Sequence, residues 1–308
     1  MLDALTLDQM RILIAVADTG SFSAAARRLG RVQSAVSQSM QTLEDTLRLS
    51  LFDRSGKTPV LTEAGRVVLD DARQVVQRAD AMRNHAESIA GGTEPALAFA
   101  VDSIFPTHLL IESLRALQHT YPCMPVTLLT EGLGAAEQRL RDGVAQFAIY
   151  CLLSTGAEDL DAEFLANVAM VPVVAVDHPL AAHEGPIGAD VLAAQVQLVL
   201  TDRSPLTSNL KGSIYSSRIW RFADLSTRHE YLRAGFGWCH MPWHMVAEDV
   251  AGGRLKRLDI PQSQGLALPL HVVRHRGTRP GVAARWLIDD LKGRLANWRT
   301  QPGLDPRP

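Results

Sequence analysis

Residues 20–65 read GSFSAAARRLGRVQSAVSQSMQTLEDTLRLSLFDRSGKTPVLTEAG, and this stretch decides the fold of the amino-terminal part of the chain. Gly20 and Gly30 enclose a short alanine-rich helix, for which Ser23 is the expected N-cap. A second helix follows after a tight turn, and its apolar stripe is Ala35 or Val36, Met40, Leu43 and Leu47. Two helices joined in this way predict a helix-turn-helix.

The opposite side of this second helix opens with small or amide-bearing side chains, namely Gln33, Ser34, Ser37 and Gln38. Amides can bond to adenine edges in a bidentate manner, and hydroxyls serve either bases or phosphates. Residues 21–43 also contain Arg27, Arg28 and Arg31 but no acidic side chain. The pattern predicts a recognition helix that enters the major groove of DNA.

A hairpin is expected after this helix, at residues 51–62, with Ser55 and Gly56 at its tip. Arg54 and Lys57 flank the tip, where cations can reach phosphates or the minor groove. With an earlier helix that begins near Thr6, residues 1–61 predict a winged helix-turn-helix. The residues expected to contact DNA are Arg28, Arg31, Gln33, Ser34, Ser37, Gln38, Arg54 and Lys57.

A long amphipathic helix is expected from Thr62 to Ala90, because apolar residues recur there at heptad-like steps: Ala64, Val68, Val75, Ala79, Met82, Ala86 and Ile89. Such a helix is about 40 Å long, more than a small domain needs for its own core. Self-association is one use of the stripe, and packing on the chain's own second domain is the other. Gly91 and Gly92 then form a hinge, so residues 62–92 are a linker and dimerisation segment.

The remainder, residues 93–308, alternates strand and helix patterns and predicts two α/β lobes. Lobe I takes about residues 93–167 and 270–300, and lobe II takes about 168–269. Ligands in such folds bind beyond the carboxyl ends of the strands. The strand ends and a glycine-rich turn supply the candidate effector-binding residues Asp102, Ser103, Ile104, Cys151, Thr201, Arg203, Phe236 and Trp238.

Two of these assignments have a structural alternative. Arg203 is either a bidentate clamp for a carboxylate or a solvated arginine in a polar turn. Phe236 and Trp238 either stack on an aromatic effector or close the hydrophobic face of their turn.

Other classes of site are less well supported. His240, His244 and Glu248 recur at i+4 spacing, but Pro242 interrupts the segment, so no metal site is expected. Cys151 and Cys239 are candidates for a thiol switch or for inert buried thiols. No nucleophile elbow, metalloprotease or phosphate-loop motif occurs in a supporting context, so neither an enzyme nor a cofactor is predicted.

Composition agrees with a globular protein, since 46% of the 308 residues are hydrophobic and 21% are charged. The opening MLDALTLDQM has no cationic region of a secretory signal, and residues 164–176 are too short for a membrane span. A cytoplasmic protein without membrane contact is expected.

The stretch at 20–65 resembles the signature of the LysR-type regulators nearly throughout, including the LE pair at 43–44, LF-x-R at 51–54 and the LT-x-AG ending. The second half resembles that family's periplasmic-binding-protein-like effector domain through looser motifs, such as L-x-DG at 140–143 and AGFGW-x-x-MP at 234–242.

This resemblance implies a sequence-specific transcription regulator that binds double-stranded promoter DNA. It also implies a homodimer that assembles to a homotetramer and a small carboxylate or aromatic effector between the lobes, with Ser103 as an anion contact. The alternative is an architectural DNA-binding protein without effector control.

Overall fold

The computed structural model describes residues 5–56, 58–152, 158–201, 214–263 and 266–298. It divides into two compact units, Met1–Gly91 and Gly92–Pro308, which are considered one at a time. No helix within the described ranges is long and apolar enough to cross a bilayer.

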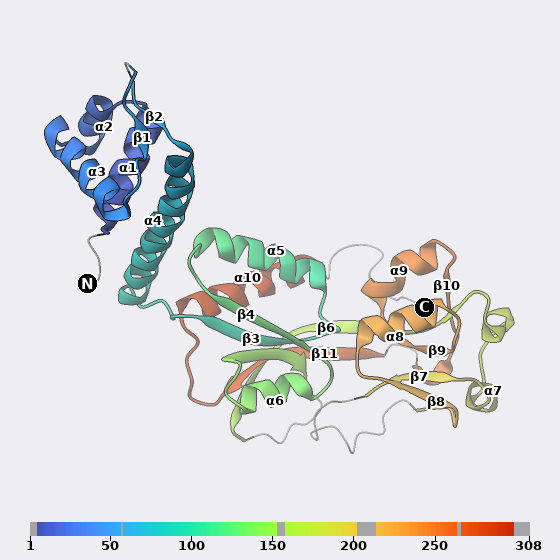
Figure 1. Ribbon diagram of the computed structural model, residues 1–308. Helices are drawn as coiled ribbons and strands as arrows, with labels where there is room; N and C mark the ends of the chain where they lie inside the picture. Colours follow the sequence, from blue (N-terminus) through green and yellow to red (C-terminus); the bar gives the residue numbers. More distant parts are fainter. Residues whose placement is uncertain (1–4, 57, 153–157, 202–213, 264–265, 299–308) are drawn as a thin grey trace. The chain divides into compact units, whose positions relative to one another are not determined.

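The first unit is a three-helix bundle with a hairpin wing and a long final helix (Figure 1). Its elements are α1 (Leu7–Thr19), α2 (Phe22–Leu29), α3 (Gln33–Leu47), β1 (Phe52–Asp53), β2 (Val60–Leu61) and α4 (Glu63–Ala90). The winged helix-turn-helix is therefore confirmed, and a single helix of 28 residues follows it.

The N-cap of α2 differs from the expected one. Ser21 has extended backbone (φ −155°) and its side chain accepts a hydrogen bond from the Ala24 N–H, whereas Ser23 lies inside the helix. The reason is that Gly20 adopts a left-handed conformation (φ 65°) to end α1, so the chain can enter α2 one residue later.

The core of the first unit forms where the three short helices and the wing meet. Val36, Met40 and Leu43 of α3 are buried there, which confirms the predicted stripe and selects Val36 over the exposed Ala35. The start of α4 packs tightly against the end of the loop before β1. A Cβ at Gly65 would collide with the carbonyl of Leu51, so this position requires glycine.

The second unit is built on one continuous sheet. Its strands are β3 (Leu97–Asp102), β4 (Val126–Glu131), β5 (Phe147–Cys151), β6 (Leu160–Ala175), β7 (Gln197–Leu200), β8 (Ile219–Phe222), β9 (Trp238–Pro242), β10 (Leu255–Arg257) and β11 (Ala267–His275). Its helices are α5 (Thr107–Thr120), α6 (Ala135–Arg141), α7 (Ala189–Ala193), α8 (Leu225–Arg233), α9 (Trp243–Ala251) and α10 (Val282–Trp298), with 3-10 turns at Pro179–Ala182 and Pro261–Ser263.

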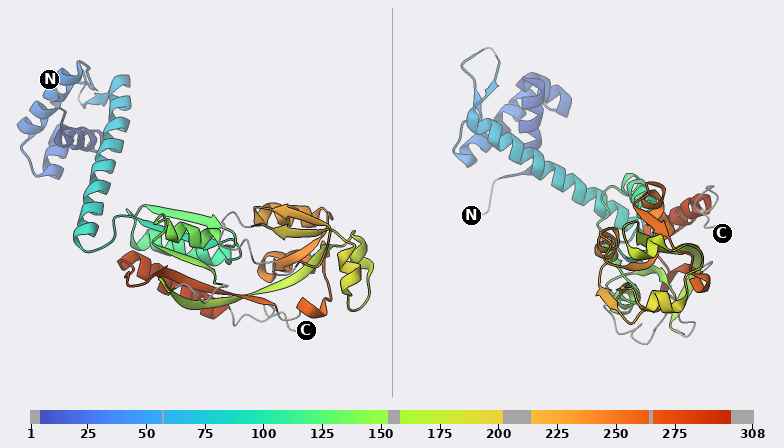
Figure 2. Two further views of the ribbon diagram at one scale, coloured as in Figure 1. Left: turned by 90° about the horizontal axis from the view of Figure 1, so that it is seen from below. Right: turned by 90° about the vertical axis from the view of Figure 1, so that its right-hand side faces the viewer.

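Strand β6 is shared by the two lobes (Figure 2). Its first part pairs with β11 as far as Ala169, and its last part pairs with β9 from Met170 onward and with β10. From Met170 to Ala175 the residues of β6 are buried throughout, whereas its first part, in lobe I, includes exposed residues.

The strand directions place two sets of strand ends opposite each other. Strands β3, β4 and β5 run parallel to one another, and β11 runs antiparallel to both β5 and β6. Strands β3 to β5 therefore run in the direction of β6, toward lobe II. Strand β9 opposes β6, and β7 and β8 run parallel to β9, so their carboxyl ends point toward lobe I.

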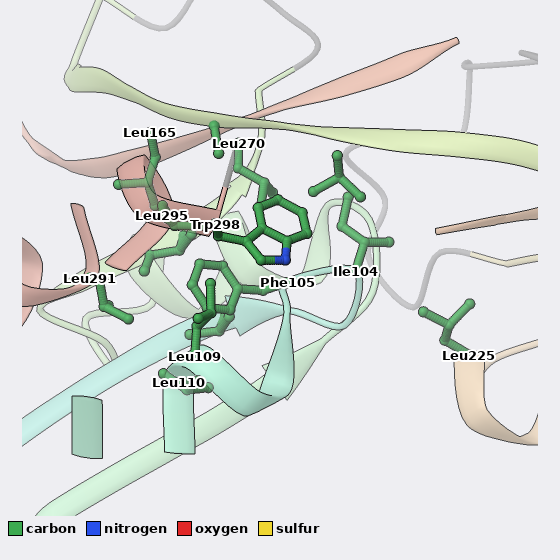
Figure 3. Packing of buried hydrophobic residues seen from close by; sticks show 14 of the residues in the cluster. Ile104, Phe105, Leu109, Leu110, Leu165, Leu225, Leu270, Leu291, Leu295 and Trp298 are labelled. Atoms are coloured by element: carbon green, nitrogen blue, oxygen red, sulfur yellow. The ribbon is translucent and has the colours of Figure 1, made fainter. Parts of the chain in front are cut away.

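One buried cluster extends through both lobes. Figure 3 shows Trp298 of α10 packed among Phe105 and residues of α5, with Leu225 of α8 beyond Ile104 at the edge of the cluster. The segment before β3 is also tied to α10, because the Glu94 carboxylate accepts hydrogen bonds from the N–H groups of Ala283 (3.0 Å) and Ala284 (2.7 Å). This contact caps the final helix from the start of the unit.

Candidate DNA-binding surface and effector site

The outward face of α3 carries the polar side chains predicted from the sequence. Gln33, Ser34 and Gln38 are exposed and Ser37 is half-buried, while Val36 on the other side is fully buried. The first turn of α3 has no side-chain cap, so its backbone N–H groups can meet a phosphate. This face therefore offers amide, hydroxyl and backbone donors together.

Gln33 is held by a residue of the preceding helix. The Ser23 hydroxyl donates to Oε1 of Gln33 at 2.7 Å. This bond leaves the Gln33 amide nitrogen as the free donor, directed by α2 as well as by α3.

The three described arginines of the predicted DNA surface all have carboxylate partners within their own unit. Arg31 forms a bidentate pair with Asp8 (2.6 and 2.8 Å), and Arg28 lies 3.6 Å from Asp18. Both guanidinium groups remain exposed, and exposed ion pairs are weak, so phosphates can compete for them.

Arg54 connects the wing to α3. Its Nη2 donates to Glu44 at 2.6 Å, and its guanidinium lies 5.2 Å from the centre of the Phe22 ring. The buried Glu44 carboxylate also accepts from the N–H groups of Leu51 (2.7 Å) and Phe52 (3.2 Å). Arg54 thus braces the wing, with N–H donors to spare for DNA, while Lys57 lies outside the described residues.

The long helix α4 has an apolar stripe that its own unit does not cover. Val75, Met82 and Ile89 recur at steps of seven and are exposed, Met82 to 72%. A stripe with this period suits a coiled-coil partner.

In the second unit, Asp102 shapes the turn that follows β3. Its buried carboxylate accepts from the Ile104 N–H (3.0 Å) and from the Ser103 hydroxyl (3.4 Å). The same turn approaches lobe II, since a Cβ at Gly132 would lie 3.5 Å from Leu200 Cδ2 and 3.9 Å from Ser103 Oγ. The predicted residues Asp102, Ser103 and Ile104 therefore lie where the two lobes meet.

Cys151 ends β5 next to this turn, but its thiol is not activated. Burial and the nearby Asp102 carboxylate raise its pKa to about 12. Cys239 is fully buried, and burial likewise raises its pKa. Because thiolates carry cysteine redox chemistry, both cysteines fit inert thiols better than a switch.

Thr201 follows β7 at the edge of lobe II that faces lobe I. Its N–H donates to the carbonyl of Phe222 at 2.6 Å. Its buried hydroxyl has no hydrogen-bond partner among the residues that the structure describes. With respect to the described residues, this hydroxyl is available to donate at the predicted site, whereas Arg203 lies outside the described ranges.

The prediction for Trp238 and Phe236 is corrected by the position of β9. Trp238 begins this strand, so it lies at the end remote from lobe I, fully buried beside Val174 and Leu180. Phe236 precedes it and joins an exposed aromatic cluster with Trp220 and Tyr231, at centroid distances of 5.2 Å from each. Packing explains Trp238, and neither ring is at the carboxyl ends of the strands.

His240 and His244 do not share a helix, since His240 belongs to β9 and His244 to α9. Burial lowers the pKa of each imidazole to about 4. No group of three or more potential metal ligands occurs within the described part of the chain.

Arg228 of α8 was missed by sequence reasoning. It is only 7% exposed, and its Nη2 donates to the His240 carbonyl (2.9 Å) and the Met241 sulfur (3.4 Å). The signal was its place in the stripe with Leu225 and Leu232, both buried, at helical spacing.

Comparison with known families covers nearly the whole chain. Residues 7–66 match the family described as "Bacterial regulatory helix-turn-helix protein, lysR family", and residues 90–296 match the "LysR substrate binding domain". YhaJ from Escherichia coli, named a probable HTH-type transcriptional regulator, is 30% identical over 94% of this chain and 96% of its own. AceR from Acinetobacter baumannii, an HTH-type transcriptional regulator, is 31% identical over 96% and 98%.

Solved structures of full-length proteins share the fold. CrgA, a LysR-type transcriptional regulator from Neisseria meningitidis, aligns with a TM-score of 0.54 at 21% identity and covers 96% of this chain and 100% of its own. An OxyR mutant from Corynebacterium glutamicum aligns with a TM-score of 0.56 at 20% identity, covering 95% and 93%. The chain therefore belongs to the LysR family: it is a DNA-binding transcriptional regulator, not an enzyme, and its second half is the family's substrate-binding domain.

Proposed function

We propose that this regulator reads a partly palindromic promoter site through α3 and responds to a small-molecule effector bound between its lobes. The observation that carries the proposal is the two-sided α3, which buries Val36 and Met40 and turns Gln33, Ser34 and Gln38 outward. Amides and hydroxyls in this position suit base edges, and Arg28, Arg31 and Arg54 suit phosphates.

The effector site is proposed at the facing strand ends, around Asp102, Ser103, Ile104, Cys151 and Thr201. Ligands in open α/β sheets bind at such carboxyl ends. The Thr201 hydroxyl, which has no partner among the described residues, and the Ser103 hydroxyl near Leu200 support this location. Effector binding would favour one arrangement of the lobes, and so one arrangement of the DNA-binding units.

The working unit is proposed to be a dimer that assembles to a tetramer in the cytoplasm. The stripe of Val75, Met82 and Ile89 on α4 supports pairing of two copies. The exposed cluster of Trp220, Tyr231 and Phe236 supports a second contact, because large exposed aromatic patches usually mark interaction surfaces. Two independent surfaces are what a dimer of dimers needs.

Gel-shift titration tests the proposal against an architectural role without effector control. The full chain is titrated onto its own upstream promoter DNA and onto random DNA at several salt concentrations. A regulator should prefer the promoter by roughly 10³-fold or more, whereas an architectural protein should bind both DNAs with the same affinity and the same salt slope. Equal binding would reject the regulator.

A further inference from the structure

The strongest unexplained feature outside the DNA surface is the guanidinium of Arg228. A guanidinium remains charged, and burying a charge is costly unless an opposite charge or a full set of hydrogen bonds compensates it. Arg228 is 7% exposed, yet its partners are one carbonyl and one thioether. Its Nε is buried and has no hydrogen-bond partner in the described ranges.

The buried carboxylate that helix α8 does contact, Asp249, pairs with other cations. Asp249 accepts from Arg233 (2.6 and 2.8 Å), from Arg254 (2.6 Å) and lies 3.0 Å from His229 Nε2. These contacts lower the pKa of Asp249, so it is fully ionised and balanced by its own cations. Helix α8 therefore carries Arg233, which pairs with a carboxylate, and Arg228, which has no carboxylate partner in the part of the chain that the structure describes.

The position of Arg228 is the edge of lobe II that faces lobe I. It lies one turn after Leu225, which belongs to the same buried cluster as Ile104 and lies on the Ile104 side of it (Figure 3). It bonds to His240 and Met241, close to the carboxyl end of β9. Thr201 follows β7 at the same edge of the lobe, and its hydroxyl has no hydrogen-bond partner within the described ranges. Two buried donor groups at the facing strand ends, Nε of Arg228 and the hydroxyl of Thr201, thus have no hydrogen-bond partner among the residues that the structure describes.

We infer that the effector of this regulator is a small organic carboxylate whose anionic group is bound by Arg228, with the Thr201 hydroxyl as a second donor. The inference rests on the proposed effector site between the lobes and adds the ligand's charge and its main contact. One guanidinium balances one negative charge, which favours a carboxylate over a phosphate dianion. Ile104 and Leu225 offer apolar contact to the rest of the molecule.

Thermal unfolding of the full chain tests this inference with named probes. Hexanoate, phenylacetate and succinate are compared with their primary amides and with inorganic phosphate and sulfate, at constant ionic strength. Three proteins are used: wild type, Arg228→Met, and Arg221→Met as a control at an exposed arginine of β8. We expect at least one carboxylate to raise the Tm of wild type and Arg221→Met by about 5 °C at saturation, and its amide to have no effect.

Arg228→Met should lose this shift while keeping a ligand-free Tm equal to or above that of wild type, because it removes an uncompensated buried charge. Arg228→Gln, which keeps hydrogen bonding without charge, should lose the shift as well. The inference is overturned if no carboxylate stabilises wild type, if only phosphate or sulfate does, if the shift survives in Arg228→Met, or if ligand-free Arg228→Met and Arg228→Gln both unfold several degrees earlier.

Promoter titration on the same preparations separates this inference from the proposed function. If wild type prefers the promoter but no carboxylate raises its Tm, the proposed function stands and Arg228 is rejected as an effector-binding residue. Loss of promoter preference in wild type rejects the proposed DNA reading, while the thermal shifts still decide whether Arg228 binds a carboxylate.

Discussion

The arginines of the predicted DNA surface and Arg228 of the second unit have opposite surroundings. In the first unit Arg28 and Arg31 are exposed and lie beside carboxylates, whereas Arg228 in the second unit is buried and has no carboxylate within the described ranges. An exposed pair is weak and screened by salt, so its partner can be exchanged for a phosphate. A buried charge without a partner instead creates a requirement for an anion. Exposure thus suits DNA backbone contacts, and burial suits recognition of one ligand.

The largest effect is expected where the first unit does bury a charge. Glu44→Ala removes the acceptor of the Leu51 and Phe52 N–H groups and the partner of Arg54. Leaving buried donors unsatisfied should destabilise the amino-terminal unit by about 3 kcal/mol. Urea unfolding of Glu44→Ala and of the milder Glu44→Gln measures this loss, and an unchanged midpoint in Glu44→Ala would show that the wing does not depend on α3.

A second effect is expected at low pH, where protonation of His240, which lies beside Arg228, should lower the free energy of unfolding. The folded pKa of His240 is about 4, below the ordinary value of 6.5, because of burial and then the Arg228 charge. As the pH falls, the unfolded chain therefore binds this proton before the folded chain does. The contribution of neutral His240 to the free energy of unfolding is fully present above pH 6.5 and is lost as the pH drops from 6.5 toward 4.

His240 alone should account for about 2 kcal/mol of the stability lost between pH 7 and pH 5. His240→Gln should flatten this part of the profile, measured by urea unfolding at each pH. His119→Gln, at an exposed position of α5, should keep the wild-type slope. Identical slopes for all three proteins would argue against a neutral, buried His240.

A smaller change in free energy is expected from loss of the base contacts of α3. Gln38→Ala or Ser37→Ala should weaken promoter binding by about 1–2 kcal/mol and random-DNA binding much less, because the contact is to a base edge. Thr46→Ala, exposed near the other end of α3, is the matched control and should leave both affinities unchanged. Equal losses on both DNAs would mean that these side chains contact only the backbone.

The smallest effect is expected at the exposed pair of Arg31. Asp8→Asn removes the carboxylate that competes with phosphate for the guanidinium. Binding to random DNA should tighten by less than about tenfold, and only at low salt. A gain that persists at high salt would contradict the view that this pair is weak.

The amino-terminal unit could be predicted from sequence because its information is local. The stripe of Val36, Met40 and Leu43 and the glycines at 20 and 30 specify helices and turns over a few residues. Even there, the position of an N-cap depended on backbone conformation at Gly20, and Ser21 took the place expected for Ser23. Helix periodicity fixes a helix better than its first residue.

The effector region was less predictable because its geometry comes from strand pairing over long separations. The sequence GFGW predicts a turn, but Trp238 pairs with Val174 and is the first residue of β9. It therefore lies at the amino end of that strand, whereas ligands bind at the carboxyl ends. Arg228 escaped notice for a related reason. A lone arginine in a helix normally points to solvent, so its helical spacing from Leu225 and Leu232 was a weak sign of burial, which the packing of α8 on the sheet makes plain.

The interleaving of the two lobes has a consequence for how the chain folds. Lobe II is made from consecutive segments between β6 and β10, whereas lobe I begins at β3 and needs β11 and α10, the last of which is capped by Glu94 from about 190 positions earlier. During synthesis the winged helix can close first and lobe II next, while β3 to β5 must wait for residues 267–298. The lobe that is started first is thus expected to be finished last, and its exposed strands are the part most in need of a chaperone.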